Sequence, residues 1–86
     1  MIELDGRRLQ RCEEGHLYMK EKLHFMEAYG CNLDALYDEL TEWSSEEEIR
    51  IYNSEYMDER IKTVFLDAVN ENKDLIIVLT NGTAMR

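Results

Sequence analysis

Residues 57–79 read MDERIKTVFLDAVNENKDLIIVL. The first part of this stretch predicts an amphipathic helix, beginning at Ser54 or Asp58, because its apolar residues recur with the 3.6-residue period of an α-helix. These apolar residues are Met57, Ile61, Val64, Phe65, Ala68 and Val69. The second part, Leu75 to Leu79, is continuously apolar and too short for a helix of its own. Continuous apolarity favours a strand that is covered on both faces, as in a parallel sheet.

The residues before this stretch predict two more strands and two more helices. Ile2 and Leu4 alternate with polar residues before a turn signal, and a second strand is expected from Ile49 to Tyr52. The first helix is indicated by a stripe with spacings of four, three and four residues: Cys12, His16, Met19 and Leu23. Asn32 is placed to cap the second helix. The residues of this helix that are expected to face inward are Leu33, Leu36 and Leu40.

The order of these elements predicts the α/β class. We expect a small three-stranded parallel sheet flanked by three or four helices, because parallel neighbours need helical crossovers and the segments between strands are long enough for them. With 86 residues, the chain is the size of one domain. We therefore expect a single domain over residues 1–86, in which the polar residues 81–86 form a frayed tail.

The charge balance limits the class of partner. Nineteen acidic and ten basic side chains give a net charge of −9. Binding to nucleic acid or to an anionic membrane needs clustered Lys and Arg, so neither is expected, whereas a cationic partner is. No stretch has the pattern of a secretory signal or of a membrane span, and the two cysteines form no CxxC motif. We expect a cytoplasmic protein with reduced thiols.

The excess negative charge is local. The segment from Asp34 to Glu59 contains ten acidic residues and one base, Arg50, whereas the rest of the chain has nine of each. On charge alone, a solvated surface and a docking surface for a positively charged partner are equally good interpretations of this acidic segment.

The sequence offers little for catalysis or metal binding. His16 and His24 are the only histidines, and motifs for metalloproteases, serine hydrolases, phosphate-binding loops and EF-hands are absent. Cys12 and His16, four residues apart, could supply half of a metal site, but no further ligands accompany them, and Cys31 has no evident base partner. We therefore expect no enzyme activity, no metal and no cofactor.

The second predicted helix departs from helix propensity in a way that suggests an interface. Asp34 suits the N-terminal turn, but Asp38 lies in the middle of the helix, four residues from a like charge. Glu39 and Glu42 flank this pair, and Tyr37 and Trp43 add aromatic surface beside it. Aromatic side chains among directed charges are typical of protein interfaces.

Residues 29–43, YGCNLDALYDELTEW, closely resemble the signature loop and helix of the barstar family. Members of that family are intracellular inhibitors of barnase-like ribonucleases, and their fold is a parallel three-stranded sheet flanked by helices. The resemblance extends over nearly the whole chain. It implies that the partner is a basic barnase-like ribonuclease or a related nuclease toxin, and that inhibition of this partner involves no covalent chemistry. It also implies that the protein is a monomer when free.

The resemblance also implies roles for individual residues. Asp38 resembles the carboxylate that enters the nuclease active site in place of a substrate phosphate, and Asp34 resembles a second acidic contact. Asp67 and Glu71 match acidic positions on the last helix, of which Asp67 is the stronger candidate for a contact. Further residues at or beside the implied contact surface are Tyr29, Gly30, Asn32, Tyr37, Thr41, Glu42 and Trp43.

This chain departs from the family pattern at several positions. Ala28-Tyr29 stands where many members have two aromatic residues, Tyr37 replaces the usual tryptophan, and Glu42 replaces a glycine. The segment before the last helix is short, so the small third helix of the family is expected to be reduced or absent. These differences bear on which nuclease this chain binds, because they change residues at the implied contact surface. The alternative function is an acidic interaction module that binds another basic protein.

Overall fold

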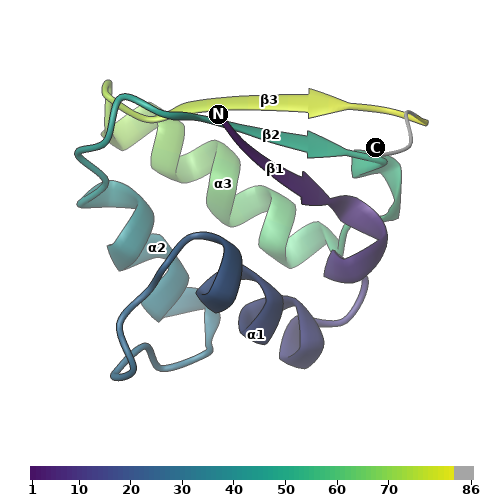
Figure 1. Ribbon diagram of the computed structural model, residues 1–86, viewed down its shortest axis with the longest axis horizontal. Helices are drawn as coiled ribbons and strands as arrows, with labels where there is room; N and C mark the ends of the chain where they lie inside the picture. Colours follow the sequence, from purple (N-terminus) through teal and green to yellow (C-terminus); the bar gives the residue numbers. More distant parts are fainter. Residues whose placement is uncertain (83–86) are drawn as a thin grey trace.

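The sheet consists of three parallel strands with β2 in the middle. The computed structural model describes residues 1–82. The strands are β1 (Ile2–Asp5), β2 (Glu48–Tyr52) and β3 (Ile76–Thr80), in the order β1-β2-β3. Ile49 of β2 is paired with Ile2 on one side and with Ile77 on the other. Figure 1 shows the three strands side by side, running in the same direction.

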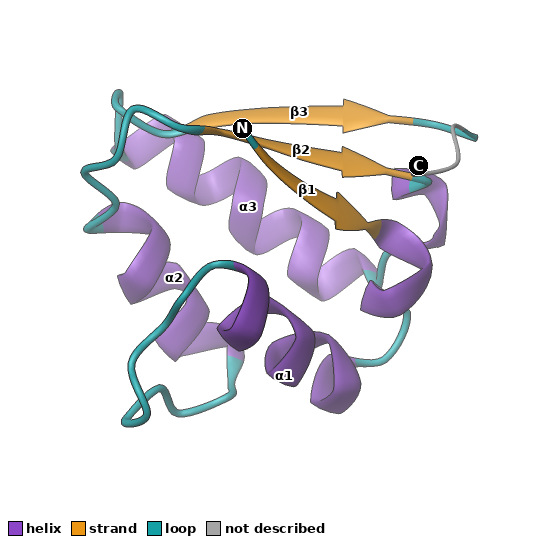
Figure 2. Cartoon of the chain, viewed as in Figure 1, coloured by secondary structure: helices purple, strands orange, loops and turns teal. Residues whose placement is uncertain are grey.

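Three α-helices pack against this sheet. They are α1 (Cys12–Lys22), α2 (Leu33–Thr41) and α3 (Glu59–Glu71), and all three lie on one side of the sheet (Figures 1 and 2). Two 3₁₀ turns, η1 (Gly6–Leu9) and η2 (Ser54–Tyr56), complete the described elements. The predicted α/β class with a three-stranded parallel sheet and three helices is confirmed. The short segment between β2 and α3 contains only the single turn η2.

The core lies between the sheet and the helices. Every second residue of β1 and β2 faces it, as the period of a strand requires. Fully buried side chains from the sheet and from all three helices fill it: Leu4, Met19, Leu36, Leu40, Ile49, Ile51, Ile61 and Phe65. Gly15 allows α1 to approach closely, since a Cβ atom there would lie 3.0 Å from Cδ1 of Ile61. The helical periods read from the sequence therefore correspond to the buried faces of the helices.

Two details of the predicted elements are wrong. β3 is an edge strand that is covered by helices on one face only, and Ile76 on its open face is 47% exposed. Its continuous apolarity therefore does not reflect burial on both faces. Met57 is buried, but it precedes α3 instead of belonging to it, because Asp58 caps this helix by accepting a hydrogen bond from the Arg60 amide.

The beginning of the polar tail contacts η2. The Ser54 hydroxyl donates to Oδ1 of Asn81 at 2.8 Å, and the Gly82 amide donates to Glu55 at 2.8 Å. The remainder of the tail that was expected to fray, residues 83–86, lies outside the described residues. No helix in residues 1–82 is both long enough and apolar enough to cross a bilayer.

Candidate functional site

The helix α2 is defined by caps at both ends. Oδ1 of Asn32 accepts a hydrogen bond from the Ala35 amide at 2.8 Å, so the predicted N-cap is confirmed. At the other end, the Glu42 amide donates to the Asp38 carbonyl, and the Thr41 hydroxyl donates to the same carbonyl at 3.1 Å. The helix is thus nine residues long and presents a defined outer face.

The outer face of α2 is acidic. Leu36 and Leu40 are completely buried, whereas Asp34 and Asp38 are exposed. Their spacing of four residues places the two carboxylates on neighbouring turns of the same helix face. The like-charge pair that was expected from the sequence is therefore present on the surface.

α3 adds two more carboxylates beside α2. The pKa of the Tyr37 hydroxyl is raised by its partial desolvation and then by the negative charges of Glu71, Asp67 and Asp38. Charges act on a hydroxyl in this way only when they lie near it. Because α2 packs against α3, and Asp38, Asp67 and Glu71 are exposed, Tyr37 lies near acidic side chains of both helices. We call Asp34, Asp38, Asp67 and Glu71 the acidic face.

Asn72 fixes the position of α3 relative to the end of α2. Its Nδ2 donates to the carbonyl of Leu40 at 3.0 Å and to that of Trp43 at 2.8 Å. The Leu40 carbonyl also accepts a bond from the Trp43 amide at 3.2 Å, so Asn72 supplies a second donor there and a donor for the Trp43 carbonyl just beyond α2. No local pattern in the sequence points to Asn72, because its partners are 32 and 29 residues away in the chain.

The acidic face is not neutralised by ion pairs within residues 1–82. The side chains of Arg7, Arg8, Lys20, Arg50 and Arg60 pair with other acids. Among the described residues, none of the four carboxylates of the acidic face belongs to an ion pair. They are thus available to a positively charged partner.

The acidic segment of the sequence does not form one surface. Glu47 pairs with the amino terminus at 3.5 Å, and Glu48 pairs with Arg50 at 2.7 Å, beside the sheet. Asp58 pairs with Arg60 at 3.1 Å at the start of α3. The acids of the segment therefore include internally paired ones, the unpaired carboxylates on α2, and others that lie away from α2 without an ion pair in residues 1–82: Glu46, Glu55 and Glu59.

The other predicted site residues lie around the ends of α2. Gly30, Asn32 and Glu42 are exposed, Thr41 is partly buried, and Trp43 is partly buried against the core. The indole nitrogen of Trp43 is buried and has no hydrogen-bond partner within residues 1–82.

Tyr29 is not part of this surface. Its side chain is only 7% exposed, and its hydroxyl lies 2.7 Å from Nδ1 of His16. The structure therefore places Tyr29 beneath the loop that leads into α2.

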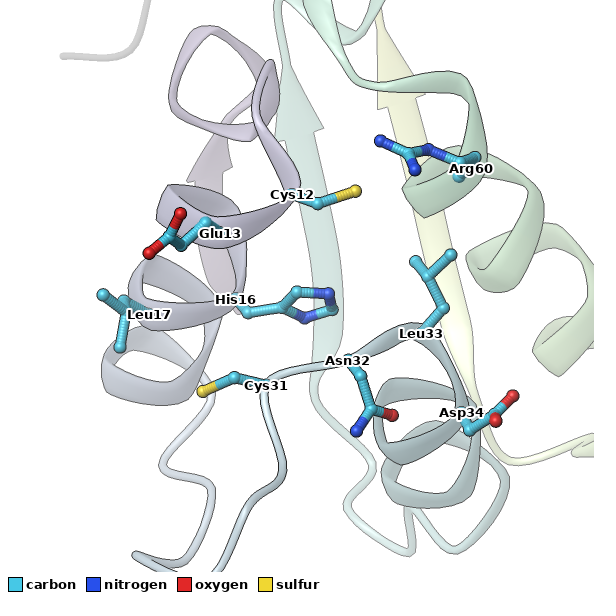
Figure 3. Close-up of a pocket in the computed structure, with 9 residues that line it drawn as sticks. All are labelled: Cys12, Glu13, His16, Leu17, Cys31, Asn32, Leu33, Asp34 and Arg60. Atoms are coloured by element: carbon cyan, nitrogen blue, oxygen red, sulfur yellow. The ribbon is translucent and has the colours of Figure 1, made fainter.

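A pocket of about 700 Å³ lies beside this loop, between the first turns of the three helices. Figure 3 shows that the imidazole of His16, the thiol of Cys12 and the guanidinium of Arg60 point into it, with Leu33 opposite. Burial raises the pKa of the Cys12 thiol and lowers the pKa of His16. In the described part of the chain, no three His, Cys, Asp or Glu side chains are arranged to hold a metal ion.

The chain matches known proteins in two comparisons. The family model described as Barstar (barnase inhibitor) matches residues 1–75. A protein of Bacillus subtilis (strain 168) named "Putative ribonuclease inhibitor YrdF" is 50% identical over 42 residues. That match covers 49% of this chain and 46% of the relative, so the aligned part spans about half the length of each protein.

Proposed function

The chain belongs to the barstar family, and from this membership we propose that it inhibits a basic, barnase-like ribonuclease or a related nuclease toxin. In this proposal the acidic face covers the active site of the enzyme. The observation that carries the proposal is the group of four carboxylates on two adjoining helices, none of which is paired within residues 1–82.

The mechanism is competition for the groups that bind RNA. A ribonuclease holds the phosphates of RNA with Arg, Lys and His side chains. Carboxylates form charge-assisted hydrogen bonds with the same groups, and these bonds are stronger than those between neutral partners. Asp38, at the centre of the acidic face, takes the place of a substrate phosphate, and Asp34, Asp67 and Glu71 pair with cationic groups around it.

The residues around the acidic face supply the rim of the interface. Tyr37 offers an aromatic ring that is partly buried and already packed against the core, so little side-chain entropy is lost on binding. We assign further rim contacts to exposed or partly exposed residues at the two ends of α2: Gly30, Asn32, Thr41, Glu42 and Trp43.

In the proposed inhibition, the protein blocks the active site of the nuclease and forms no covalent bond with it. Within the proposal the chain is not an enzyme and uses no metal or cofactor. It acts in the cytoplasm as a monomer until it meets the nuclease. The two free cysteines, Cys12 and Cys31, are compatible with a reducing compartment.

The test is titration of the protein into an RNA-cleavage assay with barnase, or with a nuclease encoded beside its gene. We expect cleavage to stop at a stoichiometric amount of wild-type protein and to continue with Asp38→Ala. Glu46→Ala is the matched control, because Glu46 is exposed and belongs to the same acidic segment. It removes the same charge from a position outside the acidic face.

The outcome separates the proposed function from its alternative. If Asp38→Ala and Glu46→Ala have equally small effects, the acidic face is not the inhibitory surface. If folded wild-type protein inhibits neither nuclease, the acidic face serves instead as a module for another basic protein.

A further inference from the structure

A buried hydrogen bond links α1 to the loop before α2. Nδ1 of His16 lies 2.7 Å from the Tyr29 hydroxyl, and the two side chains are only 2% and 7% exposed. The ring of Tyr29 also packs against Phe25, with centroids 4.7 Å apart. A hydrogen bond that is shielded from water is strong and costly to leave unpaired.

The loop that follows Tyr29 is strained. Cys31 has a φ of +50°, in the left-handed region that a side chain with a Cβ atom seldom adopts. Such a conformation persists only where the surrounding structure holds it. Two residues before Cys31 in the chain, the Tyr29 hydroxyl is hydrogen-bonded to His16. Directly after Cys31, Asn32 caps α2 through its Oδ1, and its Nδ2 donates to the Gly30 carbonyl at 3.3 Å.

Within residues 1–82, no other hydrogen bond ties residues 29–31 to α1, although Lys20 of α1 donates to Glu27 earlier in the same loop. Apart from the bond to His16, the hydrogen bonds of residues 29–31 are made to Met26 and Asn32 in the same stretch of chain. The pocket beside the loop is lined by His16 as well as by Cys31 and Asn32, and the imidazole projects into it from α1 (Figure 3). His16 and Tyr29 thus form the attachment between α1 and the start of α2.

We propose that His16 and Tyr29 are positioning residues for the partner-binding surface. Their hydrogen bond holds residues 30–32, and thereby the first turn of α2, in the geometry that the partner binds. This inference rests on the proposed function. It gives Tyr29 a role beneath the surface instead of a direct contact.

The test compares two conservative variants in the barnase assay. Tyr29→Phe removes the hydroxyl that bonds His16. Tyr18→Phe is the matched control, because Tyr18 is 5% exposed, and its hydroxyl accepts a hydrogen bond from the Asp5 amide at 2.8 Å, away from α2. We expect the two variants to lose similar thermal stability. Only Tyr29→Phe should raise the inhibition constant, by about tenfold, since a less ordered loop must be ordered on binding.

A second pair of variants tests whether the bond itself is responsible. His16→Phe keeps an aromatic ring, removes Nδ1 and extends into the pocket, where there is space. If the hydrogen bond acts as a unit, the double variant with Tyr29→Phe should inhibit no worse than either single variant. Fully additive losses would overturn the proposed role of the pair.

A readout without the partner distinguishes failure of this inference from failure of the proposed function. The Ala35 amide is held by the Asn32 cap, so its hydrogen exchange, measured by NMR, reports the order of the first turn of α2. We expect Tyr29→Phe to accelerate this exchange relative to the Leu40 amide, whereas Tyr18→Phe should not. If Tyr29→Phe leaves the Ala35 amide unchanged, the inference is wrong, whether or not the wild type inhibits barnase.

Discussion

Asp38 is the residue on which the proposed binding depends most directly. Its carboxylate accepts no hydrogen bond and joins no ion pair within residues 1–82, and a like charge lies four residues before it. An acid in this position lowers helix propensity and repels Asp34. Within the proposed function, the advantage of an acid at this position lies in its contact with the nuclease.

We expect Asp38→Ala to weaken binding to the nuclease by about 2 to 5 kcal/mol, a range that the barnase–barstar interface itself helped to establish. The free energy of unfolding should stay the same or rise slightly, because a repulsion is removed. Isothermal titration calorimetry and chemical denaturation measure the two quantities. A loss of binding that is accompanied by an equal loss of folding stability would argue against a direct contact.

His16 makes folding stability depend on pH near neutrality. Burial lowers its pKa below the ordinary value of 6.5, so the unfolded chain binds a proton more readily than the folded protein does. This contribution to stability is complete above pH 6.5 and is lost as the pH falls below that value. Asp5 and Asp58 have pKa values lowered by hydrogen bonds from Arg7 and Arg60, so their contributions are lost only below about pH 3.8.

We therefore expect the free energy of unfolding to fall in the window that opens below pH 6.5, because the unfolded chain takes up a proton on His16 before the folded protein does. Urea denaturation at a series of pH values measures this change, and His16→Gln should flatten it in that window. An equal slope in the variant would assign the proton uptake to other groups.

At the scale of elements, the arrangement of α2 against α3 forms the acidic face. α2 presents Asp34 and Asp38, and α3 presents Asp67 and Glu71, so neither helix carries the whole surface. The hydrogen bonds from Asn72 hold the C-terminal ends of the two helices together.

We expect Asn72→Ala to destabilise the protein by about 1 to 3 kcal/mol, because two carbonyls lose a donor. Inhibition should also weaken, since the carboxylates of α3 are no longer held beside Tyr37. Asn70→Ala is the matched control, because Asn70 is exposed on α3 and makes no hydrogen bond through its side chain among the described residues. Equal effects of the two substitutions on stability and inhibition would show that the link between the helices is not important.

For the whole molecule, the distribution of charge matters more than its total. The net charge of −9 includes acids that are paired with Met1, Arg50 and Arg60, and these acids contribute little field at a distance. The unpaired carboxylates of the acidic face give that side of the molecule a negative potential. In the proposed function, this potential draws a basic partner toward the acidic face before contact.

We expect the association rate constant with barnase to fall by about tenfold or more as the salt concentration rises from about 0.05 to 0.5 M, because screening shortens the range of this attraction. Stopped-flow fluorescence measures the rate, and the dissociation rate should change much less. An association rate that does not depend on salt would contradict an electrostatic docking surface.

Structural features that depend only on residues close together in the chain could be predicted from the sequence. The buried stripe of α3, the cap at Asn32 and the shared face of Asp34 and Asp38 follow from the period of the helix, which any segment with this pattern must obey. The three strands and the α/β class follow from the order and length of such segments. The family motif in residues 29–43 pointed to α2 for the same reason, since it is one continuous stretch.

Other features required the folded chain. The one-sided cover of β3, the burial of Tyr29 and the approach of Asp67 and Glu71 to Tyr37 all join residues that are distant in sequence. The same is true of Asn72, which lies next to Leu40 and Trp43 only because α3 packs along α2. Local periodicity specifies which face of an element is apolar. Which faces meet depends on the packing of all elements at once, so it is a property of the complete tertiary structure.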